Sequence, residues 1–168
     1  MHTPLEMTRL YNAPITKVFE AFSTSESLQQ WWGPKGFALE VKTYEFEPGG
    51  IFHFVLHAPG GFDMWAKWQI LEIEAPYIFR FINSFSSPAG ETVPAPEVPF
   101  GKDWPMEMVV IFQFTEEDEK TRMDFNSYPF QSSEASNVVF TENIHKMEQG
   151  FGVTFEALEQ YLKGQEEK

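Results

Sequence analysis

Hydrophobic residues near the C-terminus recur at steps of three and four, the spacing that places them on one side of an α-helix. Residues 140–162 therefore predict one long amphipathic helix, about 33 Å in length and long enough to cross a whole sheet. We expect Gly164 to end this helix, and Gly150 and Gly152 suggest close approach of its backbone to a sheet or a ligand. The apolar stripe consists of Phe140, Ile144, Met147, Phe151, Phe155, Leu158 and Leu162.

The N-terminal part predicts one strand followed by two short helices. Residues 5–11 alternate loosely between apolar and polar, as a strand does. Pro14 suits the first turn of a helix, and apolar residues follow it at helical spacing up to Phe22. A Ser or Thr cap at position 24 or 25 opens a second helix, which ends at the Gly-Pro pair at 33–34.

From residue 37 to residue 128 the apolar period is mainly two, which indicates β-strands separated by Gly- and Pro-rich turns. The two faces of the segment 64–74 cannot be assigned, because its apolar residues change parity, and a bulge would explain the change. The order predicts an α+β fold, an antiparallel sheet of six to seven strands that buries one apolar face against the long helix. The predicted strands in this region are 39–46, 51–57, 64–74, 77–82, 106–115 and 121–128.

Composition narrows the class of protein. A chain of 168 residues with 42% apolar residues can bury a sizeable core, and we expect a single domain spanning residues 1–168. The net charge of −13 argues against binding to nucleic acid or to anionic membranes, since both are bound through clustered Lys and Arg. The chain has no Cys and its N-terminus does not resemble a secretory signal, so we expect a cytoplasmic protein.

Aromatic residues make up 17% of the chain, including 18 Phe and 5 Trp. So many rings indicate either an aromatic core or a cavity lined by aromatic side chains. The pattern alone leaves both open.

Four segments in order along nearly the whole chain resemble the SRPBCC superfamily, in particular the branch named after the activator of the heat-shock-protein ATPase. The segments are APITKVFEAFSTSESLQQWWGPKGF, EFEPGGIFHFVLHAPGG, QILEIEAPYIFRF and EQGFGVTFEALEQYL. The resemblance implies a helix-grip (START-like) fold, in which a curved antiparallel sheet grips the C-terminal helix around a hydrophobic cavity. Two departures concern that cavity: Phe151 stands where the family often has Trp, and the segment 85–105 is longer than usual.

The resemblance implies that inward-facing aromatic and Met side chains line the cavity. We predict a ligand-binding set of Trp31, Trp32, Phe54, Phe79, Phe81, Met108, Phe112, Phe114, Met147, Phe151 and Phe155. The segment 85–105 contains five prolines and two glycines, which deny it a strand ladder and a helix. Phe100 and Trp104 within it are expected to close over one end of the grip as a lid, although a static surface loop is the alternative.

Candidate groups for catalysis or metal binding are few. His53 and His57 are about 13 Å apart along one strand, too far to share a metal ion, and both are expected on the outer face. His145 flanks the helix stripe, and Asp63 and Glu72 show no spacing that brings them together. Without Cys, a nucleophile elbow or a phosphate-binding Gly loop, we predict no catalytic residue, no metal and no cofactor.

Our first hypothesis is a non-catalytic protein that holds a small apolar or aromatic molecule between the sheet and the helix. The resemblance also implies two alternatives, a co-chaperone-like protein of the heat-shock-protein ATPase activator type and a cyclase-type enzyme. The expected partner is a small apolar molecule, with no nucleic acid and no membrane. A homodimer and a chaperone partner both stay open.

Overall fold

The computed structural model describes residues 3–166, apart from the side chains at 98, 99 and 166. Within that range, seven strands form one antiparallel sheet: β1 (Leu5–Tyr11), β2 (Ala38–Tyr44), β3 (Ile51–His57), β4 (Asp63–Glu74), β5 (Ile78–Phe85), β6 (Glu107–Glu117) and β7 (Lys120–Pro129). Their spatial order is β1-β7-β6-β5-β4-β3-β2, so each strand from β2 to β7 pairs with its neighbour in sequence. The first strand joins the last and completes the sheet.

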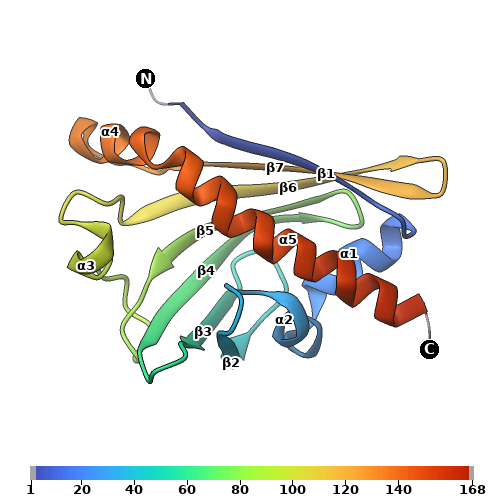
Figure 1. The fold of residues 1–168 in the computed structure, drawn as a ribbon, viewed down its shortest axis with the longest axis horizontal. Helices are drawn as coiled ribbons and strands as arrows, with labels where there is room; N and C mark the ends of the chain where they lie inside the picture. The colour runs from blue at the N-terminus through green and yellow to red at the C-terminus, as the bar shows by residue number, and fades with distance from the viewer. Residues whose placement is uncertain (1–2, 167–168) are drawn as a thin grey trace.

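The long C-terminal helix lies diagonally across one face of this sheet (Figure 1). The helices are α1 (Ile15–Ser23), α2 (Ser25–Trp31), α3 (Glu97–Phe100), α4 (Glu134–Glu142) and α5 (Ile144–Glu166). Both α1 and α2 contact α5 and close the same face of the sheet. The predicted helix-grip (START-like) fold, with two short helices after the first strand, is confirmed.

The prediction of one continuous helix over residues 140–162 was wrong at Asn143. This residue ends α4, where its backbone N–H donates to the carbonyls of Phe140 and Thr141 and its Nδ2 donates to the carbonyl of Val139 at 2.8 Å. These bonds satisfy carbonyls that a continuous helix would use itself. The apolar spacing from Phe140 to Ile144 is helical on both sides of the break, so periodicity does not reveal it.

Two predictions concern the glycines of α5, and the one for Gly164 is wrong. The helix runs through Gly164 to Glu166, so Gly164 does not end it. A Cβ added at Gly150 would meet no protein atom within 4 Å, and one at Gly152 would meet only the mobile end of Arg9 at 3.4 Å. Close approach to the sheet therefore explains neither glycine, and close approach to a ligand stays a prediction.

The parity change in β4 is a bulge at Leu71. The register with β5 shifts between Ile70 and Glu72, and the Leu71 side chain is exposed. Trp68 and Ile70 before the bulge and Ile73 after it all pack on the inner face. The suspected bulge is therefore confirmed, and it places Trp65 on the outer face of the sheet.

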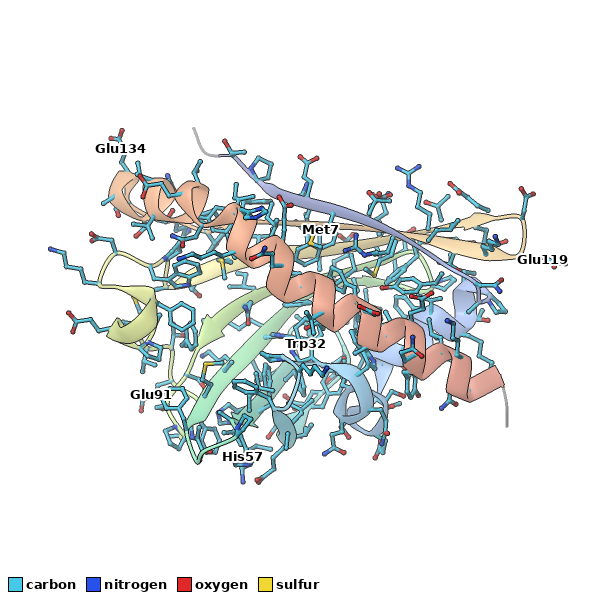
Figure 2. The ribbon with its side chains drawn as sticks, viewed as in Figure 1. Met7, Trp32, His57, Glu91, Glu119 and Glu134 are labelled. Carbon is cyan, nitrogen blue, oxygen red and sulfur yellow. The ribbon has the colours of Figure 1, made fainter. Side chains whose placement is uncertain are left out.

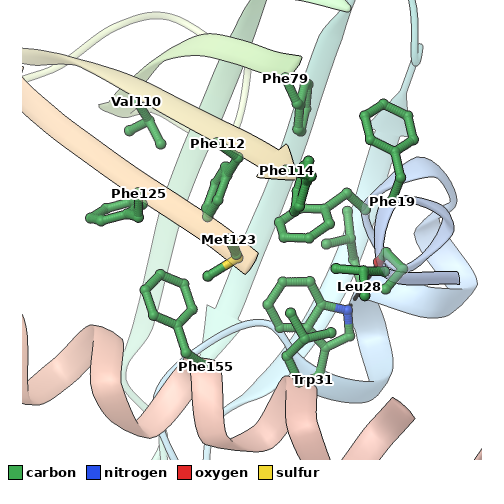
Figure 3. Close-up of a cluster of buried hydrophobic side chains, with 14 of the residues drawn as sticks. Phe19, Leu28, Trp31, Phe79, Val110, Phe112, Phe114, Met123, Phe125 and Phe155 are labelled. Atoms are coloured by element: carbon green, nitrogen blue, oxygen red, sulfur yellow. Dashed lines mark hydrogen bonds between the residues drawn. The ribbon is translucent and has the colours of Figure 1, made fainter. Parts of the chain in front are cut away.

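The main core fills the space between the sheet and the helices with aromatic rings (Figure 3). Phe22 of α1 is fully buried, and its ring centroid lies 4.8 Å from that of Phe112 and 4.9 Å from that of Trp31. The Trp31 indole N–H donates to the Ala21 carbonyl at 2.9 Å, and the Tyr11 hydroxyl donates to the Phe155 carbonyl at 3.1 Å. The first bond ties α2 to α1, and the second ties α5 to β1 of the sheet.

The segment between β5 and β6 covers part of the outer face of the sheet. Its start forms a bridge between Ser86 and Thr92 and folds back over β3 and β4. There the Ser87 carbonyl lies 3.2 Å from His53 Nε2, and Lys67 donates to the Gly90 carbonyl at 2.9 Å. The single-turn helix α3 lies further along this segment, so the expectation that it contains no helix was wrong.

Candidate functional site

A cavity of about 240 Å³ lies between the N-terminal half of α5 and strands β3 to β5. Figure 2 labels Trp32 beside α5 at this position. The strand wall is formed by Phe54, Leu56, Met64, Ala66, Trp68, Asn83 and Phe85. The helix wall is formed by Met147, Gly150, Phe151 and Thr154, and residues 32–34 form the rim.

Each wall of the cavity contains a residue with little or no side chain. Ala66 belongs to the strand wall, and Gly150, where an added Cβ would meet nothing within 4 Å, belongs to the helix wall. At the other end of α5, Phe155, Leu158 and Leu162 are buried among the rings of the main core. One helix therefore meets a filled core with its C-terminal half and a cavity with its N-terminal half.

The rim is held in place by the turn that follows α2. Gly33 has φ +113°, and a Cβ at this position would lie 2.8 Å from the Leu56 side chain, so glycine is required there. Thr154 of α5 donates its hydroxyl to the Gly33 carbonyl at 3.2 Å. This contact ties the helix to the rim.

Aromatic rings form the inner end of the cavity. The Trp68 ring stacks on Phe81 at 4.1 Å between centroids, and Trp32 meets Trp68 edge-on at 4.9 Å. Phe151 lies 6.4 Å from Trp32 and 4.7 Å from Phe125. These surfaces are flat and polarizable, which suits contact with apolar or aromatic groups.

The structure divides the predicted ligand-binding residues among three locations. Trp32, Phe54, Met147 and Phe151 line the cavity. Met108 lies beside it in a smaller space of about 40 Å³ that shares Ala66, Asn83 and Phe85 with the cavity wall. The other six pack in the main core with at most 3% exposure: Trp31, Phe79, Phe81, Phe112, Phe114 and Phe155.

The two predicted lid rings lie at the same end of the molecule as the cavity. Phe100 packs against Phe85 at 5.1 Å and against Trp104 at 5.3 Å. Trp104 lines the smaller space beside the cavity. Movement of this segment with ligand binding stays a prediction.

Sequence reasoning missed Trp68, Asn83, Ala66 and Thr154 as cavity residues. Asn83 follows Phe79 and Phe81 at period two, so the strand pattern already carried a signal for its inward direction. The bulge at Leu71 interrupts the alternation of β4, so the sequence pattern does not show that Trp68 faces inward. No local pattern points to Ala66 or Thr154.

The titratable candidates lie away from the cavity. His57 lies between two carboxylates, with Nδ1 2.7 Å from Asp63 and Nε2 2.9 Å from Glu40. The hydrogen bond with Asp63, followed by that with Glu40, raises the pKa of His57 above its usual value. Glu72 lies 3.4 Å from Arg80 instead of near Asp63.

The other two histidines of the described residues, His53 and His145, also lie outside the cavity lining. His53 lies on the outer face, where its ring packs against Trp65 at 5.3 Å. His145 is exposed, and its Nε2 lies 3.4 Å from Gln149 Nε2. Among the described residues, no three His, Asp or Glu side chains are grouped so that they could hold a metal ion.

Comparison with known proteins places this chain in a family. The family model for Activator of Hsp90 ATPase homolog 1-like protein matches residues 12–163. The chain belongs to this family. The resemblance to this branch of the SRPBCC superfamily is therefore confirmed. No curated protein matches the chain in sequence.

Solved structures with the same fold come from several bacteria. A solution structure of a protein from Arthrobacter aurescens has a TM-score of 0.79 at 23% identity, covering 96% of this chain and 86% of that one. A crystal structure of a protein from Mycobacterium smegmatis has a TM-score of 0.74 at 21% identity, covering 98% of this chain and 96% of that one. A crystal structure of the AHSA1 protein from Silicibacter pomeroyi has a TM-score of 0.70 at 17% identity, covering 97% of this chain and 99% of that one. At these identities the likeness shows the fold alone.

Within residues 3–166, no helix combines the length and the hydrophobicity that crossing a membrane requires.

Proposed function

We propose that this protein binds a small apolar or aromatic molecule in the cavity between β3–β5 and α5, in the cytoplasm and without a chemical step. The observation that carries the proposal is the cavity wall. Its side chains are mainly hydrocarbon, thioether and aromatic groups, and its rim is fixed by Gly33 and Thr154. Such a wall gains free energy by removing apolar ligand surface from water.

The volume indicates the size of the ligand. An engineered apolar cavity of about 150 Å³ accommodates benzene. The cavity here, at about 240 Å³, has room for one ring with a substituent or for two fused rings. A groove of about 840 Å³ between α2 and α5 is larger, but its lining includes Glu26, Glu156 and Gln160, so it suits an apolar ligand less well.

Naphthalene is a suitable probe, with binding measured by calorimetry and by native mass spectrometry. We expect wild-type protein to bind it and Ala66→Leu to weaken binding at least about tenfold, because the larger side chain occupies the cavity. Ala135→Leu is the matched control, since Ala135 is exposed on α4. Absence of binding by the wild type to any apolar probe would refute the proposal.

The co-chaperone and cyclase alternatives fit the same family. The match to the Hsp90 ATPase activator homologs and the net charge of −13 support the first of them. A pull-down from lysate separates it from ligand binding: a stable heat-shock-protein partner retained by the Ala66→Leu variant would favour the co-chaperone. Conversion of a bound aromatic polyketide-like substrate would favour the cyclase.

A further inference from the structure

Asn83 is a polar side chain on the inner face of β5, among apolar and aromatic neighbours. Its register partners are Trp68 on β4 and Met108 on β6, and cross-strand partners carry their side chains on the same face. Phe81 and Phe85 precede and follow it on that face at period two. Within residues 3–166, the Asn83 carboxamide makes no hydrogen bond with another protein group. Packing therefore does not explain the amide, since a Leu side chain has nearly the same size and shape.

The Asn83 carboxamide is open to the cavity. The residue is half-buried, and neither its Oδ1 nor its Nδ2 is enclosed by protein in the way that the Trp68 indole nitrogen and the Asn126 Oδ1 are. Asn83 lines both the cavity of about 240 Å³ and the smaller space of about 40 Å³ beside it. Because its side chain lies on the inner face, its accessible polar atoms border these spaces and are within reach of a molecule in the cavity.

A ligand that fills the cavity takes the place of water beside the carboxamide. A pure hydrocarbon would leave the N–H donors and the acceptor oxygen of Asn83 without a partner, which weakens its binding. Sites that can hydrogen-bond a ligand group reject analogues that lack it. Neither lining contains Lys, Arg, His, Asp or Glu, so a buried ionic group would have no counter-charge. The site therefore favours a neutral polar group at Asn83.

We infer that the ligand is a neutral aromatic or apolar compound with an amide group, whose N–H and carbonyl oxygen both pair with the Asn83 carboxamide. This inference rests on the proposed ligand-binding function and adds a requirement on the chemistry of the ligand. A cyclic amide presents its N–H and its carbonyl side by side, so it donates to Oδ1 and accepts from Nδ2 at the same time. A ketone or an ether would accept from Nδ2 and leave Oδ1 unpaired.

The compounds 2-quinolinone and 2-methylnaphthalene test this requirement, because they have nearly the same outline and only the first contains a cyclic amide. The readout is the ratio of their dissociation constants in each protein, since comparing this ratio between proteins cancels the different hydration of the probes. Asn83→Leu should shift the ratio at least about tenfold against 2-quinolinone, because leucine keeps the volume and removes both hydrogen bonds. Asn126→Leu is the matched control: Asn126 lies on the outer face of β7, outside the cavity lining, and the ratio should not change.

A third probe, 2-methylquinoline, separates a paired donor and acceptor from an acceptor alone. It has the same outline and an acceptor nitrogen, but it has no N–H. Relative to 2-methylnaphthalene, its binding should be weakened less by Asn83→Leu than the binding of 2-quinolinone is. Equal weakening of the two polar probes would overturn the requirement for a donor on the ligand.

A measurement on wild-type protein avoids dependence on the folding of Asn83→Leu. The side-chain NH₂ group of Asn83 gives a pair of signals in a proton–nitrogen NMR spectrum, and 2-quinolinone should move one of them downfield relative to 2-methylnaphthalene. Both probes are aromatic bicycles with similar ring currents, so the difference reports the hydrogen bond. Equal shifts, or an unchanged ratio in a folded Asn83→Leu protein that binds both probes, would overturn the inference and leave the proposed function intact. If no probe binds the wild type, the proposed function fails as well.

Discussion

Replacing Phe151 and Phe155 by Ala, one at a time, tests the division of α5 between cavity and core. The two rings are neighbours on the helix, 5.8 Å apart and nearly parallel, and both contact Phe125. Phe155 is 0% exposed and lies in the main core. Phe151 is only partly buried and lines the cavity. The same substitution one turn apart therefore probes two environments.

The expected losses follow from burial. Deleting a fully packed Phe costs about 3 to 5 kcal/mol through lost transfer energy and a new cavity, and we expect this for Phe155→Ala. Phe151→Ala loses only part of the transfer energy and enlarges a space that already exists, so we expect about 1.5 to 2.5 kcal/mol. For a chain of this length each kcal/mol lowers the melting temperature by about 2 to 4 °C.

Urea denaturation followed by circular dichroism gives the free energy of unfolding, with the m-value as a check on two-state behaviour. The two variants should differ by about 2 kcal/mol. Phe151→Ala should also bind larger apolar probes than the wild type does. Equal losses of free energy in the two variants, with no change in probe size, would show that Phe151 is packed as core and would refute the reasoning.

Three further predictions follow from individual contacts. Gly150→Ala should stabilise the protein by about 1 kcal/mol in thermal or urea unfolding, because the added Cβ meets no protein atom and the helix gains propensity; a loss of stability would contradict this. The NMR titration midpoint of His57 should lie above about 6.5 and fall in Asp63→Asn, since hydrogen bonding to Asp63 raises its pKa. Its contribution to stability is then complete below about pH 6.5 and is lost as the pH rises through the folded pKa; a midpoint unaffected by Asp63→Asn would refute the assignment. In hydrogen exchange, an apolar ligand should increase the protection of residues 100–105, because Phe100 and Trp104 lie at the cavity end of the molecule. The protection of residues 86–93 should not change, because this part of the segment is already bound to His53 and Lys67. A uniform response, or none when binding is proven, would exclude a lid made by Phe100 and Trp104.

The elements of the fold were largely predictable because each has a local signature. Period-two alternation located the strands, and Thr24 and Ser133 mark helix starts through hydrogen bonds to the backbone N–H groups of Ser27 and Ser136. The break at Asn143 was not predictable in this way, since a single polar Asn does not interrupt the apolar stripe, which continues from Phe140 to Ile144. Periodicity reports the direction of side chains and says little about helix continuity.

The position of the cavity was beyond local reasoning for a different reason. Seen from α5 alone, Phe151 and Phe155 have the same spacing and the same chemistry. The two rings differ in the strand residues near them. Phe155 contacts the Phe112 ring, whereas Phe151 and Ala66 both line the cavity. That pairing depends on the position of the helix across the sheet.

Asn83 shows how the sheet register converts a weak signal into a specific one. In sequence it is a polar residue at an inward-facing position of a strand, which by itself predicts either an error in the strand assignment or a polar group in the core. The register places it beside Trp68 in the same cavity wall. The register therefore places a carboxamide, with two N–H donors and one acceptor oxygen, in a wall that is otherwise largely apolar.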